Sequence, residues 1–92
     1  MKHTSLTIDG IELTACELQL LPLEVKGLPR KLIAAELNKT LSTVDSQLRI
    51  LFAKLGIHKD KELVVWAIRN NLDTEKKIKE AVRRQRREKD GK

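Results

Sequence analysis

The stretch Leu32-Ile33-Ala34-Ala35-Glu36-Leu37-Asn38-Lys39-Thr40-Leu41-Ser42-Thr43-Val44-Asp45-Ser46-Gln47-Leu48 decides the fold of this chain. Apolar side chains recur at helical spacing on both sides of Asn38, a residue that tolerates the left-handed backbone of a tight turn. Thr40 is suited to cap a second helix, because its hydroxyl can accept a backbone N–H of the first turn. We therefore expect a helix-turn-helix, with helices over about 29–37 and 41–55.

Upstream of this unit, the sequence predicts a short hairpin and then a capped helix. Residues 5–13 alternate loosely in polarity around Asp9-Gly10, a pair typical of two-residue turns because both positions adopt positive φ. A two-stranded ribbon of this length is only marginally stable alone. Thr14 and Glu17 have the spacing of a capping box, which indicates that a helix begins there.

Proline and glycine residues predict a kink in that first helix, its end and the start of the next one. Pro22 lacks a backbone N–H and clashes with the carbonyl of Leu18, so we expect a kink at this point. Gly27 is expected to end the helix as a left-handed cap. Pro29 is suited to the first turn of the helix that follows.

Two further helices are predicted downstream. One spans about 60–71 and begins at Asp60, and the other begins after Asp73 or Thr74. From Arg83 onward no apolar side chain remains, so we expect this end to fray or be disordered unless it is bound. The apolar positions of the fifth helix are Ile78, Ala81 and Val82.

Composition indicates one small domain of 92 residues with a basic tail. The expected division is an N-terminal arm or hairpin over 1–12, a core domain over 13–72 and a basic helix or tail over 73–92. The net charge is +6, and residues 73–92 hold nine basic and five acidic side chains, which favours a polyanionic partner. A single cysteine, Cys16, excludes an internal disulfide.

Several classes of protein are not expected. The sequence shows no signal peptide and no apolar run long enough for a membrane span, so a soluble cytoplasmic protein is predicted. It shows no catalytic Ser/His/Asp, paired-carboxylate or phosphate-cradling pattern, so we do not expect an enzyme. No metal site, cofactor or small-molecule ligand is predicted either.

The ordered set of residues over about 13–68 resembles the LuxR/GerE-type helix-turn-helix domain of bacterial transcription regulators. The resemblance implies an all-α fold of four helices, with the third as the recognition helix and the fourth as the dimer helix. It also implies a bacterial or phage regulator, here either a stand-alone domain without a sensor domain or a fragment. The matching residues are Leu13-Thr14, Glu17, Leu20-Leu21, Gly27, Lys31, Ile33-Ala34, Leu37, Thr43-Val44, Lys54-Leu55-Gly56 and Leu63 to Ala67.

The positions that match the family's base-reading segment are Asp45, Ser46, Gln47 and Arg49. Arginine can pair with guanine, glutamine with adenine, and aspartate can accept from the amino group of cytosine. Family members usually carry Lys at the first of these positions and His at the third, so this chain departs from the usual surface. Asp45 can also be read as a first-turn helix acid or as a contact to another protein.

Phosphate contacts are expected around the start of the recognition helix. The resemblance implies contacts by Lys31, Thr40, Thr43 and Lys54. Lys39 adds positive charge, and Ser42 adds a hydroxyl near the helix N-terminus, where the dipole favours phosphate. The predicted phosphate-binding residues are Lys31, Lys39, Thr40, Ser42, Thr43 and Lys54.

The helix over about 60–71 offers more apolar side chains than a four-helix core needs. We expect its excess, Val64, Val65, Trp66 and Ile68, to form a homodimer interface. Trp66 has two readings, as a core residue or as an anchor at that interface.

The predicted function is a sequence-specific, DNA-binding transcription regulator that acts as a homodimer on double-stranded DNA. The alternative is a protein-interaction module on the same fold that binds RNA polymerase or another regulator, with weak or nonspecific DNA binding. A third reading assigns nonspecific nucleic-acid binding to the basic tail alone.

Overall fold

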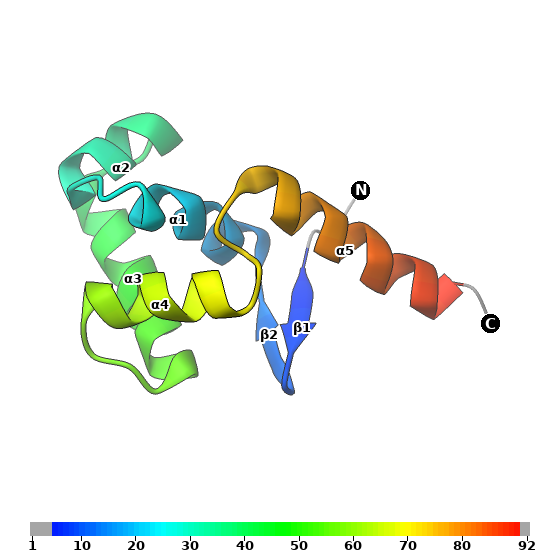
Figure 1. Cartoon of the computed structure of the whole chain (residues 1–92). Helices are drawn as coiled ribbons and strands as arrows, with labels where there is room; N and C mark the ends of the chain where they lie inside the picture. The colour runs from blue at the N-terminus through cyan, green and yellow to red at the C-terminus, as the bar shows by residue number, and fades with distance from the viewer. Residues whose placement is uncertain (1–4, 91–92) are drawn as a thin grey trace.

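The computed structural model describes the backbone of residues 5–90 and the side chains of residues 5–86. It consists of a small hairpin and five helices (Figure 1). The elements are β1 (Leu6–Ile8), β2 (Ile11–Leu13), α1 (Ala15–Val25), α2 (Arg30–Leu37), α3 (Leu41–Leu55), α4 (Asp60–Arg69) and α5 (Glu75–Asp90).

The hairpin is confirmed. β1 and β2 are antiparallel, with Leu6 opposite Leu13, and positive φ angles at Asp9 (51°) and Gly10 (80°) make the turn between them. Leu6 and Leu13 are both buried, so the ribbon is stabilised by the domain on which it packs.

Hydrogen bonds at both ends define α1. The backbone N–H of Glu17 donates to Thr14 Oγ1 (3.3 Å), and the backbone N–H of Thr14 donates to Glu17 Oε1 (2.9 Å), as the capping box predicts. Gly27 follows with a φ of 80° and ends the helix. Pro22 does not divide α1, which runs as one helix from Ala15 to Val25.

The helix-turn-helix is formed by α2, a tight turn and α3. Asn38 has the expected left-handed conformation (φ 59°), and the Thr43 N–H donates to Thr40 Oγ1 (3.1 Å) at the start of α3. The helix α2 begins one residue later than predicted, so Pro29 precedes the helix. The ψ of Pro29, 154°, is extended, so this residue does not belong to the first turn of α2. Gly56 (φ 69°) ends α3.

The helix α4 is two residues shorter than predicted. Asn71 adopts a left-handed conformation (φ 57°), and the Leu72 N–H donates to the carbonyl of Ala67 (2.8 Å). This closing turn buries Leu72 and redirects the chain into α5. At the start of α5, the Lys77 N–H donates to Thr74 Oγ1 (3.2 Å), which makes Thr74 the cap.

The expected fraying from Arg83 onward is wrong, because α5 continues to Asp90. Gln85 explains part of this order. Its carboxamide donates to the Thr7 carbonyl and accepts from the Thr7 N–H, both at 2.8 Å, so α5 is tied to β1. The remaining arginine, lysine and glutamate side chains favour a helix even without burial.

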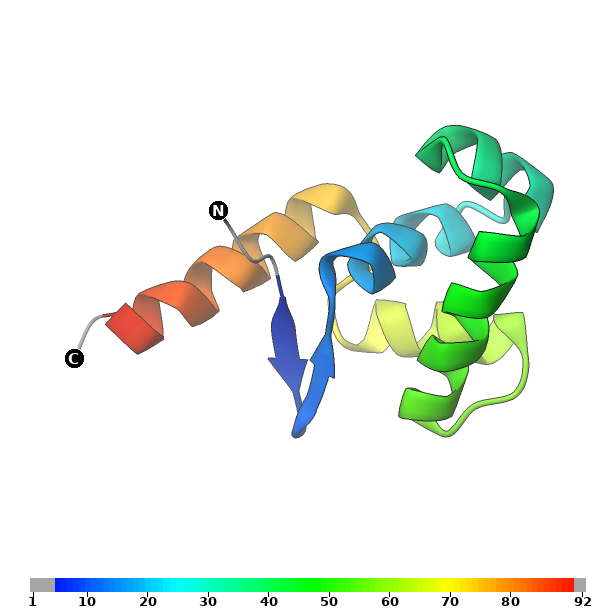
Figure 2. The ribbon, with the colours of Figure 1, turned by 180° about the vertical axis from the view of Figure 1, so that it is seen from behind.

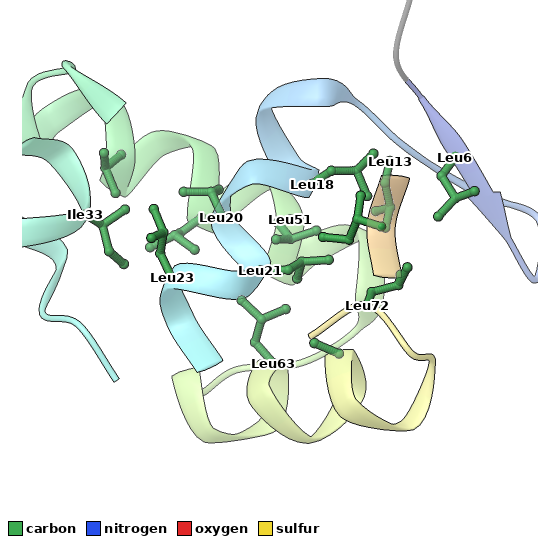
Figure 3. Close-up of a cluster of buried hydrophobic side chains, with 14 of the residues drawn as sticks. Leu6, Leu13, Leu18, Leu20, Leu21, Leu23, Ile33, Leu51, Leu63 and Leu72 are labelled. Carbon is green, nitrogen blue, oxygen red and sulfur yellow. The ribbon is translucent and has the colours of Figure 1, made fainter. Parts of the chain in front are cut away.

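One hydrophobic core joins these elements, and α1 lies at its centre (Figure 3). Leu20 and Leu21 of α1 are fully buried, and α1 packs against each of the other four helices. The core extends beyond the predicted central domain, because Leu6, Ile78 and Val82 also belong to it. The division of the chain at residues 12 and 72 stays a prediction about folding units.

One carboxylate is buried beside this core. Glu24 on α1 is only 4% exposed. Burial raises the pKa of its carboxyl from the ordinary 4.5 to about 7; the Asp60 carboxylate is the second cause and Arg30 opposes it. Arg30 itself binds Asp45 (2.9 Å) and Asp60 (3.1 Å), so one guanidinium links the start of α2 to α3 and α4.

Glu24 should make the protein less stable as the pH rises. Between pH 4.5 and about 7, the folded state keeps a proton on this carboxyl that the unfolded state has already released. Glu24→Gln keeps the shape without the charge, so it should raise the free energy of unfolding at about pH 8 by about 1 to 3 kcal/mol and change little at about pH 4. Urea denaturation at both pH values measures this. The exposed Glu36→Gln should show no such difference, and a Glu24→Gln variant that keeps the wild-type pH profile would contradict the assignment.

Gln85 should control the order of the C-terminal half of α5. Gln85→Ala removes two hydrogen bonds to Thr7 and should cost about 1 kcal/mol. Amide hydrogen exchange should speed up at Thr7 and in residues 83–90. Arg86→Ala, an exposed neighbour on the same helix, is the control and should leave the exchange at Thr7 unchanged.

Candidate nucleic-acid interface

The helix α3 has one buried side and one exposed side. Val44, Leu48 and Leu51 are fully buried. The opposite side is exposed and repeats at spacings of three and four residues, so its members share one face of the helix. This outward face consists of Ser42, Ser46, Arg49, Ile50 and Ala53. In Figures 1 and 2, α3 lies at the end of the molecule opposite the C-terminal half of α5.

The start of α3 presents hydroxyl and backbone donors. Thr40, Ser42 and Thr43 are all exposed there. Thr40 Oγ1 accepts the Thr43 N–H and lies 2.9 Å from Thr43 Oγ1, so the two hydroxyls are hydrogen-bonded to each other. The positive end of the helix dipole lies at the same place, which favours an anion such as a phosphate.

Asp45 does not lie free on the outward face. Its Oδ1 accepts from Arg30 Nη1, and the side chain is 40% exposed. Arg30 is a residue that the sequence analysis missed, because its partners Asp45 and Asp60 lie 15 and 30 positions away and no periodic signal joins them. The carboxylate therefore lies on the edge of the outward face that adjoins α2 and α4.

Gln47 lies on the opposite edge of the outward face. It is half-buried, and its Oε1 is buried without a hydrogen-bond partner among the described residues. A buried amide oxygen without a partner is unfavourable, so this side chain gains from a donor that approaches it. Ser46 and Arg49 are both exposed between the two edges.

Two of the predicted phosphate-binding lysines contact the chain itself. Lys54 Nζ donates to Glu17 Oε1 and to the carbonyl of Glu12, both at 2.9 Å, and so ties α3 to α1 and β2. Lys39 Nζ lies 3.5 Å from Cys16 Sγ. Lys31 is exposed on α2.

The predicted dimer residues share α4 but differ in exposure. Val65 and Ile68 are 49% and 53% exposed, while Val64 is half-buried. Trp66 is also half-buried and packs against the core, so it has a structural role besides any contact to a partner. A shallow hollow beside it is lined also by Ile57 and Arg69.

Two further properties concern the part of the chain that the structure describes. Within it, no group of three His, Cys, Asp or Glu side chains could hold a metal ion. None of its helices combines the length and the apolar character that a membrane crossing requires.

Comparison with protein-family models gives a match to the family described as bacterial regulatory proteins, luxR family, over residues 12–67. Comparison with curated proteins and with solved structures gives no match. The matched segment contains α1, α2, α3 and most of α4, and it covers more than half of the chain. The chain therefore belongs to the LuxR family of bacterial regulatory proteins, and its α2 and α3 form the helix-turn-helix of this DNA-binding family.

Proposed function

We propose that this protein is a sequence-specific transcription regulator that inserts α3 into the major groove of DNA. The observation that carries the proposal is the outward face of α3, which is exposed along the helix beside a capped, hydroxyl-rich N-terminus. A helix of this length fits the major groove, and its exposed side chains then reach base edges.

Four residues are proposed to read bases. Arg49 is exposed and can donate two hydrogen bonds to guanine, while Ser46 beside it can contact any base edge. Gln47 can pair with adenine when its side chain rotates and brings its buried oxygen to the surface. Asp45 can accept from a cytosine amino group at the Arg30 edge, where the guanidinium offsets its repulsion by phosphate.

The proposed phosphate contacts surround the start of α3. Thr40, Ser42 and Thr43 are exposed there, Lys39 adds charge at the turn, and Lys31 is exposed on α2. Lys54 is also proposed to contact phosphate, although its ion pair with the buried Glu17 gives it a structural role in the free protein. Such contacts hold the helix in register and carry no sequence information.

Arg49→Ala should weaken specific binding by about 1 to 3 kcal/mol and relax the preference at one base pair, because a bidentate pair with guanine is lost. The measurement is fluorescence anisotropy with a duplex selected from a random pool. Arg84→Ala, an exposed arginine of α5, is the control and should retain the preference. Equal selectivity in Arg49→Ala and wild type would remove Arg49 from the reading set.

We also propose that two copies pair through α4. Val65 and Ile68 expose large apolar side chains on this helix, and Val64 and Trp66 extend the same element. Burying such side chains against a second copy is favourable. A two-fold pair of helix-turn-helix units would place its half-sites about one DNA turn apart.

Ile68→Asp should shift the protein towards monomer and weaken binding to a two-part site, because a charge would be buried at the interface. Sedimentation equilibrium at increasing concentration measures the first effect. Leu32→Asp changes another exposed large apolar residue, on α2, and should leave the association unchanged. A wild-type protein that is monomeric at high concentration, with and without DNA, would contradict the dimer.

A second candidate function is a protein-interaction module that binds RNA polymerase or another regulator. Asp45 and Asp60 beside α3 favour it, because the two carboxylates share one guanidinium and leave a surplus negative charge that repels phosphate. A steep salt dependence with a large ratio of specific to nonspecific affinity supports the regulator. Weak and equal binding to all sequences supports the module.

Nonspecific binding by α5 alone is best tested by substitution. Truncation after Leu72 would remove Ile78 and Val82 from the core, so a loss of binding could result from unfolding instead of from the loss of basic side chains. Replacing the exposed Arg83, Arg84 and Arg86 with glutamine leaves the core intact.

A further inference from the structure

We infer that Ile50 reads the methyl group of thymine, so that the preferred DNA site carries a thymine next to the base pair that Arg49 contacts. This inference rests on the proposed function. Its starting observation is that Ile50 is 55% exposed, the highest value among the exposed large hydrophobic side chains of the described residues.

Ile50 lies on the outward face, on the side of Ser46 that is nearer to Gln47. It follows Arg49 directly, lies one turn after Ser46 and precedes Ala53 by three residues. All four are exposed, so an α3 that lies in the groove with Arg49 at a base edge brings Ile50 and Ala53 to the groove floor with it.

The chemistry of the major groove fits an apolar side chain at this point. Thymine is distinguished there by its C5-methyl group, which is recognised by apolar contact. The branched side chain of Ile50 is stiff at χ1, so little freedom is lost when it meets a methyl group. Asp45 and Gln47 lie at the two edges of the face, and the exposed Arg49 and Ile50 lie between them.

A protein-docking patch is a poorer match to the same residues. Leu41, another exposed apolar side chain of α3, is nine positions from Ile50 and therefore half a turn away around the helix axis. The neighbours of Ile50 on its own side are the small Ala53 and four polar or charged residues, Ser46, Gln47, Arg49 and Lys54. A single large apolar side chain among hydrogen-bonding groups suits one methyl group better than an apolar groove.

The test combines Ile50→Ala with removal of the thymine methyl. A duplex is selected with the wild-type protein from a random-sequence pool, and each thymine is then replaced singly by deoxyuridine. For wild type, we expect one or two replacements to weaken binding about fourfold, the effect of one buried methyl-sized group. For Ile50→Ala, the same replacements should have no effect, because the contact is already lost.

Leu32→Ala is the matched control, since Leu32 is similarly exposed but lies on α2; it should keep the wild-type response to deoxyuridine. Alanine has the higher helix propensity and Ile50 is exposed, so Ile50→Ala should fold, which circular dichroism checks. The inference is overturned if wild type and Ile50→Ala respond alike to every replacement, and the proposed function then still stands. If the wild-type protein selects no sequence, the proposed function fails and this inference with it.

Discussion

Burial of the leucines of α1 is the interaction on which the other elements depend. Leu20 and Leu21 are fully buried, and α1 packs against α2, α3, α4 and α5. A buried leucine contributes about 1.5 to 3 kcal/mol. The helix α2 has eight residues and is too short to be stable alone, so its place beside α3 depends on this core. The orientation of the helix-turn-helix is therefore a property of the whole domain.

Two ion pairs then determine which charges reach the surface of α3. Arg30 holds Asp45 on one edge, and Glu17 holds Lys54 on the other. Partly exposed pairs such as Arg30–Asp45 add little stability, so their main effect is on the position of charge. The face between them carries Arg49 and the apolar Ile50. Its specificity would come from the four proposed base-reading residues and from apolar contact by Ile50, with general attraction to phosphate supplied around the start of the helix.

Turn and capping preferences predicted most of the fold, because they depend only on residues that are close in the sequence. The turn at Asp9-Gly10, the capping box at Thr14 and the left-handed Asn38 are confirmed, since each follows from backbone sterics or a hydrogen bond a few positions away. The bounds of α2 and α4 were wrong by one or two residues, and the larger error occurred where distant residues act. The order of α5 beyond Arg83 depends in part on Gln85 meeting Thr7, which lies 78 positions earlier.

The sequence by itself determined the helix-turn-helix, its caps and its turn, because helical periodicity and capping chemistry are written in short segments. It also placed Ser46 and Arg49 on the outer side of α3, through the spacing of the buried Val44 and Leu48. Only the tertiary structure decided which polar side chains are committed within the molecule. The partners of Asp45, Lys54 and Glu24 come from other elements. Burial and charge act between residues that are close in space but far apart in the sequence, so the sequence alone does not reveal them.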